Sequence, residues 1–478
     1  MKTLAKLLKL SLLFLLCGLM VFGTVCCSKD TTSSGSVLYG NDEDEEFDDD
    51  DDSVTVTKKN AVGGGSTAAT YNDNLKRSYT IDEKGKQNFL DSVPKSLSGQ
   101  EVTILVWWPA FEFETKKMEN FTKKTGIKVK FVYASSDNYM QKLSALKAQD
   151  NSPDIACITV GNYPSAIMQK YFKPLSAGKL KYDKSVYDLD SMNLLKWNNE
   201  YYGAIYKGTT HITMGLLMYN ADLFSKYGVT DPHTLWQQNK WNWDTFVKTG
   251  QEIQSKSGVR ALTAEYQGYR LAQTCGQDAI SFSNGKLVNN LSNSTYRNAY
   301  KWLNDLGLDG QYKIVDFGLN RNGFMDGKSA MMVEETWALQ TGERYEKLPF
   351  TLGYAPLPCQ TTKTIVPCDA QLWGFPVGSK HTEAAAYVLE YWMNPKFDEA
   401  GYNLWTNDSV ASFCDWLWEQ PKVFKVCEGI INYGGDYKWT TFQYECASSG
   451  KANVDSVMDK WSNVIDGNLK KIYSEFGS

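Results

Sequence analysis

The chain has 478 residues with a formal net charge of −5, and hydrophobic residues make up 42% of it. This length suits two or three domains, and the composition is that of packed, globular cores. Ten acidic residues cluster in 42–52, so the rest of the chain is close to neutral, which argues against a nucleic-acid binder and its basic face. The 15 tryptophans and 28 tyrosines suit a polar ligand with flat apolar faces, such as a sugar, although large cores also consume tryptophan.

Residues 1–27 have the pattern of a secretory leader. Three lysines precede an apolar run of 16 residues, which is shorter than the roughly 20 residues of a membrane-spanning helix. The run ends at Cys26 and Cys27, and a polar stretch follows. This junction resembles a bacterial lipoprotein processing site, where the new N-terminal cysteine carries a lipid. We therefore expect a lipoprotein signal peptide over 1–26 and lipidation at Cys26 or Cys27; a plain signal peptide and an uncleaved anchor are the alternatives.

Residues 27–97 have little apolar periodicity and include the acidic run and a Gly-Gly-Gly-Ser stretch at 63–66. Like charges extend a chain, and glycine and serine keep it flexible. The segment therefore predicts a tether. The acidic run lacks the glycine and glutamate spacing of a calcium loop, so we expect it to be solvated.

Seven cysteines lie beyond the tether. An exported protein permits disulfides, and the closest pairs are Cys359 with Cys368 and Cys414 with Cys427. Each pair would close a short loop worth about 2–3 kcal/mol. Seven is an odd number, so at least one thiol has no partner among them. The three histidines form no zinc-ligand pattern, and we expect neither a metal nor a cofactor.

Five segments after residue 100 alternate between strand and helix patterns. Apolar or alternating runs indicate strands, and apolar residues at helical spacing indicate helices. The β-α-β-α-β order predicts a parallel sheet with helices on both faces. The predicted elements are a strand at 101–108, a helix at 113–125 that ends before Gly126, a strand at 127–132, a helix at 140–147 and a strand at 155–160.

Short motifs then follow in an order that resembles one family. Each motif is weak alone, and together they cover about 101–400. They resemble the extracellular solute-binding proteins of bacterial sugar ABC transporters, the group that includes maltose-binding protein. The motifs are 101–108 with SPDI at 152–155, YYGAIY at 201–206 with LMYNADLF at 217–224, WNWDTF at 241–246, FMDGKSAMM at 324–332 with Trp337, GYAPLP at 353–358, and WGFPVGSKHTEAA at 373–385.

The resemblance implies an α/β fold with two lobes, periplasmic-binding-protein-like, with a doubly wound sheet in each lobe and a hinge between them. The chain would cross between lobes near 207–212 and 353–358. The ligand cleft would lie at the carboxyl ends of strands, and the lobes would close around the ligand. The implied boundaries are 98–208 and 357–402 for the first lobe, and 209–356 and 403–478 for the second.

Sugar sites combine aromatic faces with amides and carboxylates that bind hydroxyl groups. Trp337 matches the family's second-lobe stacking tryptophan, and Trp108 ends the first strand at the expected cleft edge. A core position is the alternative for each aromatic residue. The ligand-binding candidates that the resemblance implies are Trp108, Glu112, Asn162, Tyr163, Thr210, Trp337, Trp373 and Trp405.

These features predict the carbohydrate-binding component of an ABC import system, which delivers its ligand to membrane permeases. We expect a monomer, lipid-anchored to the outer face of the bacterial cytoplasmic membrane, without nucleic-acid partners. Two alternatives remain: a surface glycan-capturing lipoprotein without a transporter, and a secreted glycan-processing enzyme. Hydrolysis would need two carboxylates about 5–10 Å apart across the glycosidic bond. Glu334 and Glu335 are adjacent in the chain, and adjacent side chains rarely face the same substrate. We therefore do not expect an enzyme.

Overall fold

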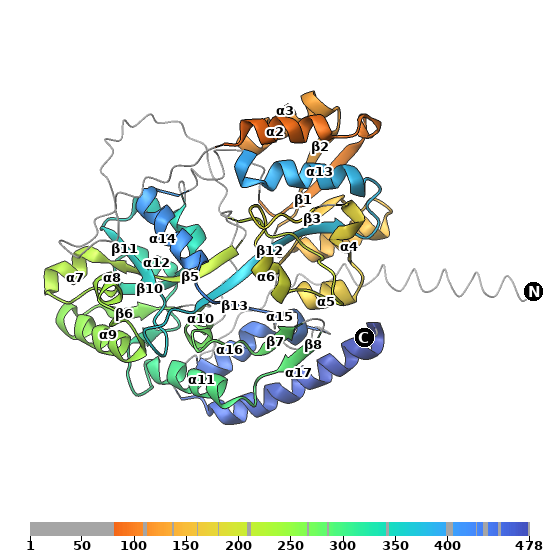
Figure 1. Ribbon diagram of the computed structural model, residues 1–478. Coiled ribbons are helices and arrows are strands. Elements are labelled where there is room, and N and C mark those ends of the chain that lie inside the picture. The colour runs from red at the N-terminus through yellow and green to blue at the C-terminus, as the bar shows by residue number, and fades with distance from the viewer. Residues whose placement is uncertain are drawn as a thin grey trace, which may run out of the picture. The chain divides into compact units, whose positions relative to one another are not determined.

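The computed structural model (Figure 1) describes most of the chain after residue 80. The leader, with Cys26 and Cys27, and residues 27–80 of the predicted tether lie outside the described residues, whereas residues 83–92 of that tether form a helix and not a flexible segment. None of the described helices is long and apolar enough to span a membrane. The described residues are 81–108, 112–135, 138–159, 161–179, 181–207, 212–264, 267–283, 286–340, 344–397, 405–426, 428–433, 438–447 and 451–476.

A mixed sheet of 11 strands organises this part of the chain. Its order is β2-β1-β3-β12-β5-β10-β6-β9, with β11 added to β5, and β4 and β13 added to β12. The strands are β1 (Glu101–Val106), β2 (Lys128–Tyr133), β3 (Ile155–Thr159), β4 (Phe172–Lys173), β5 (Ile212–Asn220), β6 (Arg260–Thr263), β9 (Val315–Asp316), β10 (Ser329–Glu335), β11 (Leu352–Pro356), β12 (Val366–Pro376) and β13 (Lys422–Phe424), while β7 (Ile280–Ser283) and β8 (Lys286–Asn289) form a separate hairpin.

Helices pack against both halves of this sheet. Near β1 and β3 they are α2 (Glu83–Ser92), η1 (Lys95–Leu97), α3 (Glu112–Thr125), α4 (Tyr139–Ala148), α5 (Tyr163–Met168), η3 (Leu175–Gly178), α6 (Leu189–Leu194), α13 (Thr382–Met393) and η7 (Pro395–Phe397). The remaining helices are α7 (Ala221–Tyr227), α8 (Pro232–Gln237), α9 (Trp243–Ser257), α10 (Tyr269–Gln273), α11 (Ser294–Leu306), α12 (Arg321–Met325), η5 (Thr336–Leu339), η6 (Arg344–Lys347), α14 (Asp408–Trp418), α15 (Glu428–Ile431), α16 (Trp439–Ala447) and α17 (Val454–Phe476).

The first half of the sheet confirms the predicted strand and helix order. β1 pairs in parallel with both β2 and β3. Val102, Ile104 and Leu105 are fully buried, as expected for a strand covered on both faces. α3 ends where Gly126 takes a φ of 77°, a left-handed conformation that glycine adopts without steric cost.

β12 joins the two halves of the sheet and runs through the centre of Figure 1. Its residues 371–374 pair with β3, and its residues 368–370 pair with β5. The second crossing was expected at 353–358, but that segment holds β11, which pairs with β5. The strand that pairs with both halves is β12, which comes after residues 353–358 in the chain. Below, the first lobe means the half built on β1, β2 and β3, and the second lobe means the half built on β5, β10 and β6.

Two of the sequence motifs meet at one buried carboxylate in the first lobe. Asp154, from the SPDI motif, accepts hydrogen bonds from Ser379 Oγ at 2.8 Å and the backbone N–H of His381 at 3.1 Å. It also accepts from the backbone N–H of Thr103 on β1 at 3.0 Å. Asp154 is 4% exposed, so its hydrogen bonds to two other segments, β1 and residues 379–381, stabilise the packing of all three.

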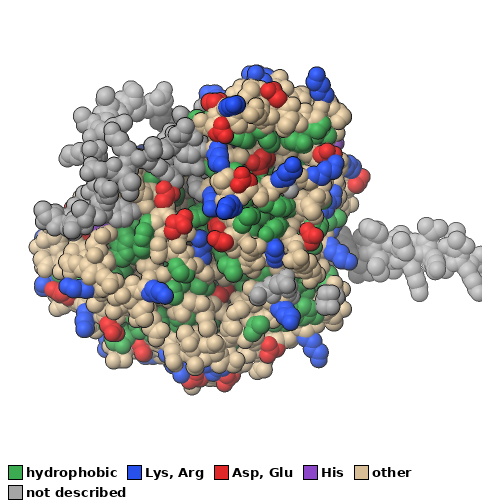
Figure 2. All heavy atoms as spheres, viewed as in Figure 1, with side chains coloured by type: hydrophobic (Ala, Val, Ile, Leu, Met, Phe, Trp, Pro, Cys, Tyr) green, Lys and Arg blue, Asp and Glu red, His purple; other side chains and the backbone are tan. Residues whose placement is uncertain are grey.

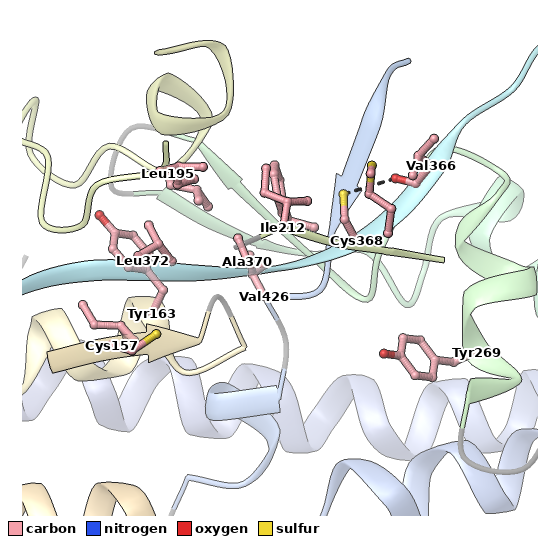
Figure 3. Close-up of a cluster of buried hydrophobic side chains, with 14 of the residues drawn as sticks. Cys157, Tyr163, Leu195, Ile212, Tyr269, Val366, Cys368, Ala370, Leu372 and Val426 are labelled. Atoms are coloured by element: carbon pink, nitrogen blue, oxygen red, sulfur yellow. Dashed lines mark hydrogen bonds between the residues drawn. The ribbon is translucent and has the colours of Figure 1, made fainter. Parts of the chain in front are cut away.

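The second lobe has helix signals that the sequence displays directly. Asn242 caps α9 by accepting from the backbone N–H of Thr245 at 3.0 Å, and the side chain of Thr245 completes a capping box. α16 and α17 pack together against α11, as Figure 1 shows. At the centre of the sheet, Ile212 lies beside Ala370 and Leu372 of β12 in a fully apolar environment (Figure 3).

Candidate functional site

A platform of tryptophans lies where β1 ends. Trp107 and Trp108 follow β1 and are both half-buried. Trp108 meets Trp107 edge-on at 5.3 Å between ring centroids, and meets Trp373 edge-on at 5.8 Å. Trp392 packs against Trp373 from α13 at 4.8 Å. Four indoles thus form one rigid aromatic surface, of which Trp107 and Trp108 reach solvent.

The indole of Trp108 is also hydrogen-bonded. Its Nε1–H donates to Glu114 Oε2 at 3.3 Å, and the Nε1–H of Trp392 donates to the other carboxylate oxygen at 3.2 Å. Glu114 is 6% exposed. One buried carboxylate on α3 therefore links the outer tryptophan of the platform to the inner one.

Two predicted ligand contacts have no accessible surface in this structure. Trp373 and Tyr163 are both 0% exposed. Trp373 lies within β12 and stacks beneath Trp107 with the two rings 18° apart. Tyr163 packs edge-on against Phe282 of β7. Both tryptophan and tyrosine therefore support neighbouring side chains, and the core alternative describes them better than a ligand contact does.

Trp337 lies on η5, immediately after β10, and is half-buried. Its Nε1–H donates to Glu335 Oε2 at 3.0 Å. Glu335 in turn forms an ion pair with Arg270 of α10. The guanidinium of Arg321 lies over the Trp337 ring, 5.6 Å from its centroid, which is within range for a cation–π contact. Trp337 is thus held through its edge and one face by charged side chains.

The other predicted ligand-binding residues are Trp405, Asn162, Thr210 and Glu112. Trp405 is half-buried and forms a β-bridge with Gln340, so the structure brings it to the end of η5, on which Trp337 lies. Asn162 occupies the N-cap position of α5 without a side-chain capping bond, and its amide donates instead to Thr159 Oγ1 at 3.2 Å. Thr210 and the side chain of Glu112 lie outside the described residues.

The loop after β3 contacts the C-terminal part of the chain. The backbone N–H of Gly429, on α15, donates to the carbonyl of Gly161 at 2.7 Å. Beside this contact, Lys425 Nζ lies 2.9 Å from Glu428 Oε2 and 3.6 Å from Asp369 Oδ2 on β12. The Asn162 loop therefore adjoins a charged cluster rather than an aromatic one.

Burial and charge act in opposite directions on Lys425. Burial alone would lower the pKa of this amine, but Tyr269, Asp369 and Glu428 surround it and raise the pKa well above its ordinary value. The pKa of Tyr269 is raised by burial, although Arg270 and Lys425 oppose that shift. Lys425 consequently stays charged and Tyr269 stays protonated at neutral pH.

The sequence motifs did not single out Arg270, Lys425 or Asp369. A signal was present for Glu335, since it stands two residues before Trp337 in the same motif. Glu334 and Glu335 point to different partners: Glu334 accepts from Tyr345 Oη at 2.8 Å, whereas Glu335 pairs with Arg270. Among the described residues, no group of three His, Cys, Asp or Glu side chains could hold a metal ion.

The structure holds Cys359 and Cys368 as free, buried thiols, so the disulfide that their spacing allows is not formed in it. Cys368 lies in the apolar centre of β12 (Figure 3), and Cys359 contacts the backbone of Ile365. Burial raises the pKa of each thiol to about 12. Cys414 is buried in α14; Cys427 lies outside the described residues, so that pair stays a prediction.

The structure thus combines an α/β sheet, whose two halves share the strand β12, with a half-buried tryptophan in each half. Residues 116–409, more than half of the chain, match the model of the family described as bacterial extracellular solute-binding protein. The chain belongs to this family.

Solved structures share this fold at low sequence identity. The sugar-binding protein MalE from Xanthomonas citri is 17% identical, with a TM-score of 0.61 over 79% of this chain and 99% of that one. The GacH receptor of Streptomyces glaucescens, solved unliganded and with acarbose, is 20% identical, with a TM-score of 0.59 over 78% and 99%. A solute-binding protein from Agrobacterium vitis with bound D-mannitol is 17% identical, with a TM-score of 0.53 over 78% and 99%. These likenesses establish the two-lobed α/β fold.

Proposed function

We propose that the protein captures a sugar or oligosaccharide between its two lobes and delivers it to the permeases of an ABC import system. The observation that carries this proposal is the pair of Trp108 and Trp337. Each follows a central strand of its lobe, each keeps part of its indole exposed, and each is anchored by a carboxylate. Indole faces cover the apolar side of a pyranose ring, and nearby charged groups bind its hydroxyls.

The charges around the site favour an uncharged ligand. Arg270 is paired with Glu335, and Lys425 is paired with both Asp369 and Glu428. Figure 2 shows basic and acidic side chains interspersed across the face in view. An acidic ligand would have to displace a carboxylate that already holds each of these cations. The hydroxyl groups of a neutral sugar can instead hydrogen-bond to such pairs without separating them.

Export and lipid anchoring at Cys26 or Cys27 belong to this proposal. The family description places its members outside the cell, and an anchored capture protein keeps its ligand close to the membrane. Metabolic labelling with a palmitate analogue, compared between the native chain and a chain with both cysteines replaced by serine, tests the anchor. Loss of label only in the double variant is expected. If the double variant still takes up the label, the lipid is attached at a residue other than Cys26 or Cys27.

Thermal unfolding of the protein without its leader, against a panel of mono- and oligosaccharides and polyols, tests ligand capture. A ligand present at 1,000 times its Kd adds about 4 kcal/mol to the unfolding free energy, which is a shift of several degrees. A shift with one sugar class, with the sugar recovered intact, supports a binding protein. Hydrolysis of the sugar would favour the secreted enzyme. In a strain that lacks ABC permeases for the bound sugar, we expect binding without uptake. Unchanged uptake would favour a surface capture protein without a transporter.

A further inference from the structure

The indole N–H of Trp337 donates to a protein carboxylate, although the side chain is exposed enough for this N–H to bind water instead. A fully buried indole N–H needs a protein acceptor, whereas a partly exposed one can donate to water. Trp461, in the helical core, is 0% exposed and donates to Glu445 Oε2 at 2.7 Å. Trp337 and Trp108 are only half-buried, yet each also donates to a carboxylate. The acceptors at these two positions therefore orient the rings.

The acceptor of Trp337 is itself held. Glu335 uses one carboxylate oxygen for the Trp337 N–H and the other for the guanidinium of Arg270. Arg270 is 1% exposed, and its Nε–H donates to Gln267 Oε1 at 2.7 Å. Its guanidinium also lies 5.2 Å from the centre of the Tyr269 ring. A short chain of contacts thus runs from the interior of α10 to the exposed indole.

Trp108 is held in the same way, by a carboxylate that lies on helix α3. Glu114 lies on α3, is 6% exposed, and accepts from Trp108 with one oxygen and from the inner Trp392 with the other. In each lobe a carboxylate uses one oxygen for the half-exposed tryptophan and the other for a buried group. An indole fixed at its N–H edge keeps its ring plane in one orientation, which lowers the entropy lost when a ligand stacks on it.

We propose that Glu335, backed by Arg270, and Glu114 are positioning residues that fix the ring planes of Trp337 and Trp108 for stacking on the ligand. This inference rests on the proposed capture of a sugar. The carboxylates act through the indoles rather than on the ligand itself, so removing their charge should loosen the tryptophans and weaken stacking. The two tests below separate these effects.

The first test needs no ligand. Side-chain N–H signals of the 15 tryptophans are recorded by NMR for the native protein and for Glu335→Gln and Glu114→Gln. The Trp337 signal, assigned by its disappearance in Trp337→Phe, should move upfield and exchange faster with water in Glu335→Gln, because a charged acceptor has become a neutral one. Glu445→Gln should move only the Trp461 signal. An unmoved Trp337 signal in Glu335→Gln would overturn the proposal.

The second test uses a double-mutant cycle with maltotriose as the probe, measured by calorimetry. Glu335→Gln should weaken binding about tenfold, and should have no further effect in a Trp337→Phe background, where no indole N–H remains. Glu445→Gln should leave the affinity unchanged. If Glu335→Gln weakens binding equally in both backgrounds, Glu335 contacts the ligand directly and the positioning role is wrong.

Glu335→Gln leaves the buried Arg270 without its carboxylate, so the single variant can lose stability. The double variant Arg270→Met with Glu335→Gln removes both charges and keeps an acceptor for the indole. It should melt close to the native protein and still show the shifted Trp337 signal. If the indole signals respond as expected but neither maltotriose nor any panel sugar binds, the positioning contact stands and the sugar-binding function fails.

Discussion

Each lobe fixes the N–H edge of its half-exposed tryptophan with a carboxylate, but the two lobes differ in what packs against the indole ring. In the first lobe, Trp108 rests on other indoles, with Trp107 and Trp373 in edge contact. In the second lobe, Trp337 lies among charged groups, with Glu335 at its edge and Arg321 over its ring. The charged groups around Trp337 are themselves largely buried, so salt screens them less than it screens exposed ion pairs. The ring of Trp108 is therefore packed against other aromatic rings, whereas the ring of Trp337 is packed against a charged side chain.

The largest expected effect is on the aromatic platform. Trp373→Ala removes a fully buried indole from β12 and leaves a cavity beneath Trp107 and Trp108. We expect a loss of about 3–5 kcal/mol of unfolding free energy, measured by chemical denaturation. Trp418→Ala, at a partly buried position on α14, serves as the comparison and should cost less. An equal loss in both variants would contradict a special role for the platform.

A smaller loss is expected when the charged network is broken on one side. Glu335→Leu leaves the guanidinium of Arg270, 1% exposed, without its carboxylate. Because Glu335 keeps 12% exposure, water compensates in part, and we expect a loss of about 3 kcal/mol. Arg270→Met in the same chain should restore most of it. A double variant as unstable as Glu335→Leu would show that packing, and not the ion pair, carries the effect.

The first lobe also has one buried carboxylate that should make its stability depend on pH. Glu390 of α13 accepts from Tyr187 and Tyr206, and burial raises its pKa above the ordinary 4.5, although these hydrogen bonds oppose the shift. The folded state therefore binds this proton more tightly than the unfolded chain. Its contribution to stability is complete below about 4.5 and is lost as the pH rises through the raised pKa.

Glu390→Gln should flatten that pH dependence, which denaturation at a series of pH values from 4 upward measures. Glu383→Gln, a half-exposed carboxylate on the same helix, is the control and should leave the slope as it is. A slope unchanged by Glu390→Gln would assign the dependence to another group.

The smallest expected effect concerns the thiols near the junction of the lobes. Cys359 and Cys368 are buried and free, and burial raises the pKa of each to about 12. We expect a reducing agent to leave the melting temperature unchanged, and non-reducing peptide mapping to find no link between them. If the reductant lowered the melting temperature by several degrees, a disulfide would be present and the free thiols of the structure would be wrong.

Sequence reasoning succeeded where the signal is local. The strand and helix order of 101–160 follows from apolar periodicity, and the family motifs from 101 to 400 matched the fold. It did not reveal that Trp373 and Tyr163 are fully buried, because a side chain that faces a cleft and one that faces the core can have the same neighbours in the chain. Trp373 is buried because β12 pairs with β3 and packs against other tryptophans, and Tyr163 is buried against Phe282 of β7. Both contacts join segments far apart in the chain, which no local pattern shows.

What the sequence by itself determined are features in which a residue acts on its near neighbours. The helix stop at Gly126 and the capping box at Asn242 are of this kind, since each involves backbone groups within four residues. Only the tertiary structure decided which distant charges meet. Arg270 of α10 forms its ion pair with Glu335 at the end of β10, and Lys425 reaches Asp369 because β13 pairs with β12. Such contacts depend on how strands are ordered in the sheet, and strand order is a property of the whole fold.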